Sequence, residues 1–516
     1  MSNKKEMNTG LSRRNFLKIF AAGAASTVGT IALGPLAGLT GAQEAGVLRV
    51  AWDEIATLDP RAASGDSEIA FLTAIFDHLI NTDAGSNLVP ALATAWEVSE
   101  DGTQYTLTIR DDVTFHDGSA LTIADILWTI NWQIESEGTV TDLLGSVESF
   151  EEGDNNTLVI TLAEPNPDFL FNLTDNKLVI LKEGTEEVND PTTFVGTGPF
   201  ILEEYLPQNR ATFVANENYW EGTPSVERLE FIFYPDTQAG IALVQGGQAD
   251  AIFRLDNASF LGFTGDTNFT ATDIPTSGHR VIRLRSDREP GSNPLVREAF
   301  RLATDRQAIW DRVQLGFGAV GKDSPIGPAF GDFFLADAEV PARDPEAAAA
   351  LLAEAGFPDG IDIVLHGPNT SEFPDLAASI VAQWEEAGIR AELNLTPENI
   401  YYGNGDWTEV DLGITGWGPR PTAQTYLDLA YQTGAAFNES HYSNPEMDEL
   451  IDRARTTIDS EERVEIYHEI QRLFLEDGPV IVPYFFAQYM VTAANVAGID
   501  LHPFAGRTRF NTATVS

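Results

Sequence analysis

The chain has 516 residues, too many for a single hydrophobic core, so we expect two or three domains. It carries 31 Lys and Arg residues against 78 Asp and Glu residues, a formal net charge of −47, and it has no Cys. Such an acidic surface repels nucleic acid and anionic membranes, while the lack of Cys excludes disulfides, thiolate metal sites, Cys nucleophiles and a lipid-modified N-terminal Cys.

The first 42 residues have the pattern of a cleavable export signal. Basic residues between Lys4 and Lys18 precede an uncharged apolar stretch at 20–42, and the small residues that end at Ala42 suit a signal peptidase. Residues 12–18 (SRRNFLK) resemble a twin-arginine signal, which implies export in a folded state. We therefore expect a protein in the periplasm or on the extracellular face of the cytoplasmic membrane, and not a lipoprotein.

Without this segment the protein is still more acidic. Residues 1–42 hold five basic residues and one acidic residue, so 26 basic residues face 77 acidic ones in the remainder, about −51. Only three lysines lie beyond residue 42, namely Lys177, Lys182 and Lys322. We interpret this composition as an adaptation to concentrated salt, which screens the repulsion. Because the acids are spread along the whole chain, a site for a cationic substrate is the weaker alternative.

The first half of the mature chain is rich in expected strands. A strand at 47–52 leads into a turn-rich loop at 53–60 and a helix at 68–80. Further strands are expected at 95–98, 105–109, 114–115, 157–162, 200–206, 211–215, 229–234 and 281–284, with helices at 122–134 and from about 236.

The second half alternates helices with strands, as an α/β sheet requires. Expected helices lie at 295–303, 305–315, 345–355, 373–387, 445–456 and 461–475, and expected strands at 361–366, 390–395 and 480–486. Asp344 and Asn444 are placed to cap two of these helices, each followed by Pro at the first helical position. The mixture predicts an α/β protein of two lobes, the first of them subdivided.

Residues 411–429 (DLGITGWGPRPTAQTYLDL) form the most informative stretch. A buried strand is expected around Leu412 and Ile414, and two Gly and two Pro within residues 416–421 then end regular structure. Trp417 and Arg420 stand in this break. Ligands bind beyond the carboxyl ends of strands in open α/β sheets. A ligand site and a surface loop whose Trp fills a gap in the core are both compatible with the pattern.

One glycine-rich run could be taken for a phosphate-binding loop. Residues 316–321 fit G-x-G-x-x-G, but Asp323 stands where a P-loop has Ser or Thr, and the run follows an expected helix rather than a strand. We interpret the run as a helix end followed by a loop.

No catalytic or metal-binding pattern stands out. The seven His residues show no metal-ligand spacing, and there is no G-x-S-x-G elbow. Asp117 and Gly118 after His116 are interpreted as a turn. We expect a non-enzymatic protein without cofactor or metal. A secreted glycosidase or peptidase is the alternative from a different class.

Five motifs in order resemble the peptide/nickel class (family 5) of solute-binding proteins of ABC importers, and they span residues 47 to about 495. They are FHDGSALTIADI at 115–126, GTGPF at 196–200 with NENYW at 216–220, REAFRLATDR at 297–306, LLAEAGFPDG at 351–360 and YSNPEMD at 442–448.

The resemblance implies a two-lobed α/β fold like that of periplasmic binding proteins, with a hinge and an extra subdomain. By analogy the first lobe comprises 43–76, 196–281 and 492–516, its inserted subdomain 77–195, and the second lobe 282–491. The implied function is extracytoplasmic capture of a peptide or peptide-like solute for a membrane permease. The implied protein is a monomer.

The resemblance also suggests ligand contacts. Glu54 and Ala56 resemble the first-lobe contacts of the oligopeptide binders, and Gly416, Trp417 and Gly418 resemble the backbone that runs along the peptide. Where the family has an acid that pairs with the peptide amino group, this chain has Arg420. That exchange favours an anionic or sugar-like ligand, such as an oligosaccharide or opine, or a blocked peptide. Further candidate residues are Thr422, Asn438, Tyr401, Tyr402 and Trp407.

Overall fold

The computed structural model describes residues 46–516, apart from 136–138, 187, 189 and 404. The expected export signal, with its cleavage after Ala42, lies outside the described residues. All described residues belong to one compact unit. No described helix is long and apolar enough to cross a membrane.

The described chain is built on one mixed sheet of twelve strands. The strand order is β15 (Ile389–Thr396), β14 (Ile361–Pro368), β16 (Leu412–Trp417), β12 (Phe269–Leu284), β18 (Tyr484–Ala493), β11 (Ala251–Ile252), β1 (Val47–Asp53), β10 (Arg228–Tyr234), β9 (Arg210–Ala215) and β8 (Phe200–Leu206). Two short strands, β13 (Ala319–Val320) and β17 (Val480–Ile481), pair with β18 and β12.

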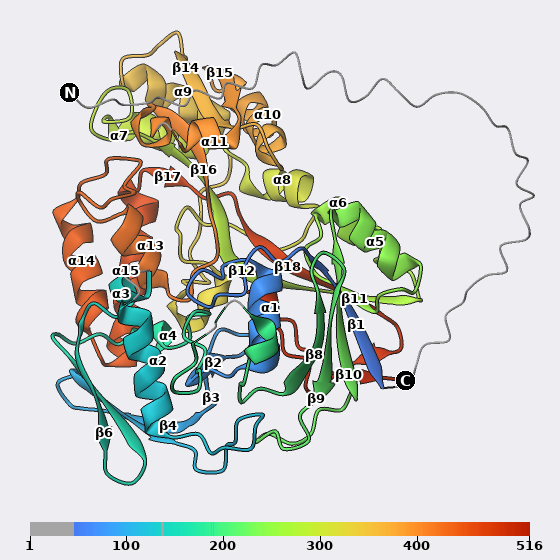
Figure 1. Cartoon of the computed structure of the whole chain (residues 1–516). Helices are drawn as coiled ribbons and strands as arrows, with labels where there is room; N and C mark the ends of the chain where they lie inside the picture. The colour runs from blue at the N-terminus through green and yellow to red at the C-terminus, as the bar shows by residue number, and fades with distance from the viewer. Residues whose placement is uncertain (1–45, 136–138, 187, 189, 404) are drawn as a thin grey trace, which may run out of the picture. The chain divides into compact units, whose positions relative to one another are not determined.

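Strands β12 and β18 join the two halves of this sheet. They pair antiparallel from Phe269 to His279, with a register shift between Pro275 and His279. Beyond the shift, β12 pairs with β16 instead, from His279 to Leu284. Figure 1 shows β12 and β18 between the strands β1, β8, β9 and β10 and the strands β14 and β16. The ends of β12 therefore belong to different halves of the sheet.

A second, four-stranded antiparallel sheet has its own core. Its order is β4 (Ala93–Val98), β5 (Gln104–Ile109), β7 (Thr157–Leu162) and β6 (Val147–Gly153). Alternate residues of β7 are buried, which is the period of a strand with one face on a core. The elements around it are β2 (Ile80–Thr82), β3 (Leu88–Pro90), α2 (Ile123–Glu135), α3 (Thr139–Leu143) and α4 (Phe169–Asn172).

Helices cover both halves of the main sheet. On the β1 side these are α1 (Asp66–Ile75), α5 (Thr237–Gln245) and α6 (Asn257–Leu261), with the C-terminal pair β19 (Val496–Ala497) and β20 (Thr514–Val515). On the other side they are α7 (Pro294–Leu302), α8 (Arg306–Ile309), α9 (Pro345–Glu354), α10 (Phe373–Glu385), α11 (Glu398–Tyr401), α12 (Asp406–Glu409), α13 (Ala423–Ala430), α14 (Pro445–Thr456) and α15 (Ser460–Asp477). Short 3-10 helices are η2 (Pro191–Thr193), η4 (Pro328–Phe333) and η5 (Ala505–Arg507), and η4 is kinked at Gly331.

Four expected elements differ in the structure. The strand expected at 114–115 is only an isolated bridge between Thr114 and Ala120. The helix expected at 68–80 ends at Ile75, because Asp77 leaves it to accept buried hydrogen bonds from Tyr219 (2.9 Å) and Trp220 (3.1 Å). The helix expected at 305–315 is the short α8 followed by the π-helix η3 (Trp310–Gln314). The strand expected at 480–486 is broken into β17 and β18 next to Pro483, which has no N–H for the ladder.

The glycine-rich run at 316–321 follows a helix end, as expected, but Ala319 and Val320 within it form the short strand β13 instead of a loop. Leu315 adopts φ 54°, in the left-handed region where a helix stops. A Cβ on Gly321 would lie 1.8 Å from the carbonyl oxygen of Val482. Glycine is therefore required there by the close approach of two backbones.

Candidate functional site

The loop that follows β16 is fixed to the register shift of β12. The Ser277 hydroxyl accepts a hydrogen bond from Arg420 N and donates one to Arg420 O, both at 2.9 Å. The Tyr426 hydroxyl lies 2.8 Å from Gly418 O and 2.9 Å from Ser277 O. The backbone of Arg420 is thus held on the strand that joins the two halves of the sheet.

The side chain of Arg420 is exposed and lines a cavity of about 280 Å³, together with Thr422. The same cavity is lined by Phe171 and Asp175 from the first half of the chain and by Arg507 from the C-terminal segment. The structure therefore brings together two of the predicted site residues and adds an arginine that the sequence analysis did not nominate.

Arg507 is carried by η5, which packs against α1. Gly506 N donates to Asp66 Oδ1 at 3.1 Å, and a Cβ on Gly506 would lie 2.4 Å from Asp66 O. The guanidinium of Arg507 donates to Thr174 O. Burial lowers the pKa of Arg507 to about 10, and the negative charge of Asp175 partly opposes this shift.

A larger cavity of about 600 Å³ adjoins the first one. The two share Ser86, Phe171, Pro421 and Thr422 as lining residues. The larger cavity is also lined by η4 and by the beginning of α15. A solute at Arg420 can therefore extend past Thr422 into this second space.

A buried ion pair at the larger cavity joins the small sheet's subdomain to α15. Arg463 holds Asp168 through two bonds, Nη1–Oδ1 at 2.8 Å and Nη2–Oδ2 at 2.5 Å. The arginine itself is fixed by Ala454 O, which accepts from its Nε at 2.8 Å. This pair links segments 295 residues apart across the cavity.

The structure places Trp417 in the core. The residue is 8% exposed, and its Nε1 donates to Glu439 Oε1 at 3.2 Å. Thr415 donates to the same carboxylate at 2.7 Å, and Arg283 Nε does so at 3.2 Å. Burial raises the pKa of Glu439, and the charge of Arg283 opposes this shift. The indole is held from inside the fold, while its role as a ligand contact stays a prediction.

Replacing Trp417 by Phe should lower the free energy of unfolding by about 1–3 kcal/mol, because Glu439 loses a buried donor. Ligand affinity should be unchanged. Denaturant unfolding and calorimetric titration measure the two effects. Trp52→Phe is the matched control, since that buried indole has no hydrogen-bond partner among the described residues. Reduced affinity at unchanged stability in Trp417→Phe would identify the indole as a ligand anchor.

The remaining backbone candidates lie apart from the two cavities. Glu54 and Ala56 are exposed, and Ala56 N donates to Glu68 Oε1 at 3.1 Å. Gly416 N donates to the Tyr402 hydroxyl at 3.3 Å. The Cβ position of Gly418 faces open space, with no described atom within 4 Å. Their contact with a ligand stays a prediction.

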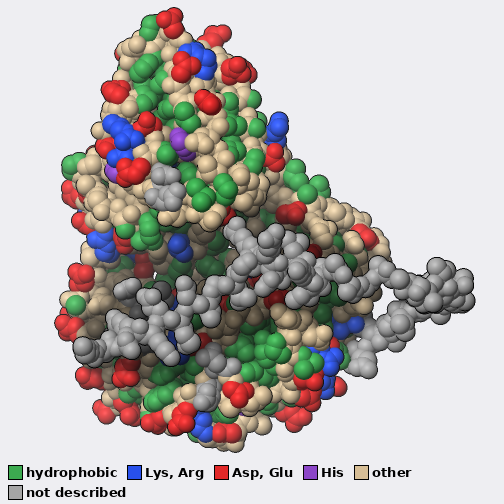
Figure 2. Space-filling view, turned by 45° about the horizontal axis from the view of Figure 1, so that its top comes forward, with side chains coloured by type: hydrophobic (Ala, Val, Ile, Leu, Met, Phe, Trp, Pro, Cys, Tyr) green, Lys and Arg blue, Asp and Glu red, His purple; other side chains and the backbone are tan. Residues whose placement is uncertain are grey.

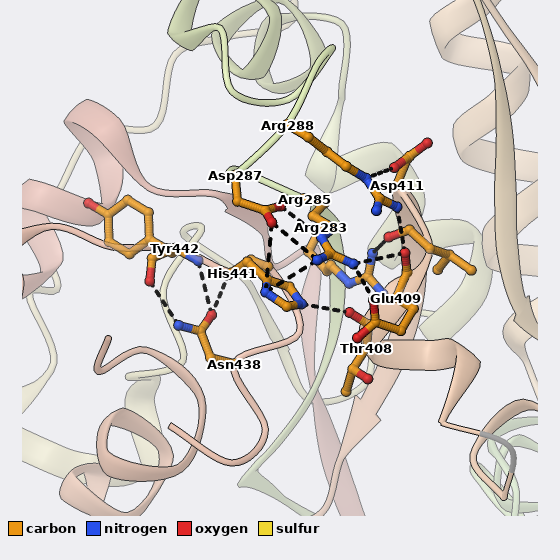
Figure 3. Close-up of polar contacts among 12 residues, drawn as sticks. Arg283, Arg285, Asp287, Arg288, Thr408, Glu409, Asp411, Asn438, His441 and Tyr442 are labelled. Atoms are coloured by element: carbon orange, nitrogen blue, oxygen red, sulfur yellow. Dashed lines mark hydrogen bonds and ion pairs between the residues drawn. The ribbon is translucent and has the colours of Figure 1, made fainter. Parts of the chain in front are cut away.

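Asn438 uses its side-chain amide to shape a turn. Its Nδ2 donates to Gln432 O (3.2 Å) and Tyr442 O (2.8 Å). Its Oδ1 accepts from Ser440 Oγ and Tyr442 N, both at 3.1 Å. Figure 3 shows Asn438 beside Tyr442 and His441. The amide therefore has both of its donors in use, and its predicted contact with a ligand remains untested.

Three further arginines gather near this turn, and each is paired. Arg285 donates to Asp287 (2.7 Å) and Glu409 (2.6 Å), and Arg288 donates to Asp411 at 2.6 Å (Figure 3). Arg283 is bound to Glu439. These arginines are satisfied within the fold, unlike Arg420.

The aromatic candidates Tyr401, Tyr402 and Trp407 pack on one another. The ring centroids are 5.1 Å apart between the tyrosines and 5.8 Å apart between Tyr402 and Trp407. Burial raises the pKa of Tyr402 to about 12. Among the described residues, no group of three His, Cys, Asp or Glu residues could hold a metal ion.

Comparison with known proteins identifies the relatives of this chain. The model of "Bacterial extracellular solute-binding proteins, family 5 Middle" matches residues 87–438. Heme-binding protein A of Haemophilus influenzae is 28% identical over 85% of this chain and 87% of its own length. The dipeptide-binding protein of Escherichia coli is 25% identical over 88% of this chain and 91% of its own.

The structure of HbpA2 from Haemophilus parasuis superposes with a TM-score of 0.83, at 25% identity, covering 91% of this chain and 100% of that one. The two-lobed α/β fold expected from the sequence is thereby confirmed. The boundaries of the lobes stay a prediction.

Proposed function

Because the chain belongs to family 5 of the bacterial extracellular solute-binding proteins and is the substrate-binding component of an ABC transporter, we propose that it captures a peptide or peptide-like small solute between its lobes. The solute is then delivered to the permease subunits. The main support for this proposal is the cavity of about 280 Å³ at Arg420 and Thr422, because its size suits a small solute.

We assign the lobes the ranges expected from the sequence: 43–76, 196–281 and 492–516 for the first lobe, 77–195 for its subdomain, and 282–491 for the second lobe. Support comes from β12 and β18, which join the two halves of the sheet. Hinge motion at these strands would open and close the cavity. The ion pair between Asp168 and Arg463 would then form when the lobes close.

The N-terminal residues imply where the protein works. A twin-arginine signal at 1–42 exports the folded protein, which acts as a monomer outside the cytoplasmic membrane and carries no lipid anchor. It has no enzymatic activity. In support, the relatives it matches are named as binding proteins.

Arg420 favours a second candidate ligand within the same fold. An exposed cation at the cavity, with no acidic side chain in ion-pair distance among the described residues, suits an anionic solute such as an opine or an acidic oligosaccharide. Both candidates use the same cleft and the same permease.

Native mass spectrometry of the full-length protein purified from cells tests the proposal. We expect a retained peptide or peptide-like mass that disappears after partial unfolding and refolding. A retained sugar or opine would favour the second candidate ligand over a peptide. Cleavage of added peptides by the pure protein would contradict a binding role and favour a secreted hydrolase.

A further inference from the structure

We propose that the solute carries a net negative charge, and that Arg420 and Arg507, which both line the smaller cavity, bind its acidic groups while Asp175 faces its amino group. This inference rests on the proposed function and deepens it by naming the charge class of the solute. An acidic dipeptide such as alanyl-glutamate, with two carboxylates and one ammonium group, has the matching set of charges.

Unpaired arginines are unusual in this protein, because acidic residues outnumber basic ones, 78 to 31. Most described arginines have a carboxylate within 4.0 Å. Those that have none are Arg312, Arg420, Arg472 and Arg507. Arg312 and Arg472 are exposed and line neither cavity, whereas Arg420 and Arg507 line the same one.

Each arginine of the pair is positioned by the fold. The backbone of Arg420 is held by Ser277, at the register shift of the strand that joins the halves of the sheet. Arg507 is held by its bond to Thr174 O and by the packing of η5 on α1. Among the described residues, Thr174 O is the one hydrogen-bond acceptor of the Arg507 guanidinium. Its remaining donors are therefore free for a ligand.

The surroundings of the pair strengthen its attraction for an anion. Phe171, Leu429 and Phe504 also line the cavity, and apolar side chains near charges lower the local dielectric constant, which strengthens the attraction between opposite charges. Burial already lowers the pKa of Arg507 to about 10, so an added negative charge would relieve a cost of the free protein. Charge-assisted bonds from two guanidinium groups to carboxylates are among the stronger polar contacts of proteins.

Asp175 completes the charge pattern. Its Oδ1 accepts from Lys177 N at 2.9 Å, and the residue lines the cavity beside Arg507. With two cations and one anion, the three side chains carry one net positive charge. The rest of the solute extends toward Thr422 and Phe171, which both cavities share.

Calorimetric titration of the full chain with alanyl-glutamate and alanyl-glutamine tests the inference. The two dipeptides have the same shape and differ by one negative charge. We expect alanyl-glutamate to bind at least about 10-fold more tightly, as a charged hydrogen bond permits. Arg420→Gln and Arg507→Gln should each reduce this preference to about 3-fold or less. Arg472→Gln, an exposed and equally unpaired arginine, should preserve it.

Arg507→Lys keeps the charge in case Arg507→Gln fails to fold, and it should retain part of the preference. Equal affinity of the wild type for both dipeptides, or an undiminished preference in Arg420→Gln and Arg507→Gln, overturns the inference while the peptide-binding function stands. If no dipeptide binds but succinate binds and is lost in both Gln variants, the acidic subsite holds and the peptide proposal fails. If neither the dipeptides nor succinate bind, both the acidic subsite and the peptide-binding function are contradicted.

Discussion

Replacing Asp323 by Ala should lower the free energy of unfolding by about 3–5 kcal/mol, the range found when one partner of a buried ion pair is removed. Its partner Arg306 has a side chain that is 5% exposed, and the side chain of Asp323 is 1% exposed. Arg306 Nε donates to Asp323 Oδ1 at 2.7 Å, and Val482 N donates to the same oxygen at 3.2 Å. The variant leaves a buried guanidinium with no counter-charge and frees the loop after the glycine-rich run.

Denaturant unfolding at one fixed salt concentration measures this loss. Asp362→Ala is the matched control, because Asp362 also pairs with an arginine, Arg390, at 2.7 Å, but with side chains 79% and 46% exposed. Its unfolding midpoint should not change, since water and ions already screen that pair. Equal losses in the two variants would show that burial of the Asp323 pair does not govern its contribution.

Features that depend on neighbouring residues could be predicted from the sequence. Asp344 caps α9 by accepting from Ala347 N at 2.9 Å, and Asn444 caps α14 by accepting from Glu446 N at 2.9 Å. Both helices begin at the expected Pro. The glycine-rich run could also be told apart from a phosphate-binding loop, because the expected helix before it and Asp323 after it are both its neighbours in sequence.

Features that depend on contacts between distant residues could not be predicted in this way. Arg507 meets Thr174 across 333 residues of sequence, and no local pattern near residue 507 indicates a binding wall. The hydrogen bond that Trp417 Nε1 donates to Glu439, 22 positions away, likewise has no signature in the local sequence. Arg420 was found from the sequence because it departs from a family pattern. Arg507, which lines the same cavity, lies in none of the family motifs found in the sequence.

Lowering the salt concentration below about 1 M should unfold the mature protein. At a net charge of about −51, the folded surface repels itself, and the Debye length grows from about 3 Å at 1 M to about 10 Å at 0.1 M. Figure 2 shows acidic side chains scattered over the face in view, with fewer basic ones. Two of the three lysines are engaged, Lys182 with Asp117 and Lys322 with backbone carbonyls. Few cations therefore remain to offset the acids.

Thermal unfolding of the chain without residues 1–42, measured between about 0.1 and 3 M KCl, tests this expectation, and the midpoint should rise steeply with salt. Sucrose at matched osmolality is the control, because it favours compact states without screening charge. Full stability in dilute buffer would contradict the interpretation of the acidic composition as a salt adaptation.

Salt also screens the attraction between the cavity arginines and an anionic solute. Concentrated salt weakens attraction between exposed charges, but it weakens contacts inside a closed cavity much less. Arg507 is partly buried, and burial lowers its pKa to about 10, so we expect salt to screen its contacts less than those of the exposed Arg420. We therefore expect the preference for alanyl-glutamate over alanyl-glutamine to persist in 2 M KCl. It should depend more strongly on Arg507 than on the exposed Arg420 as the salt concentration rises.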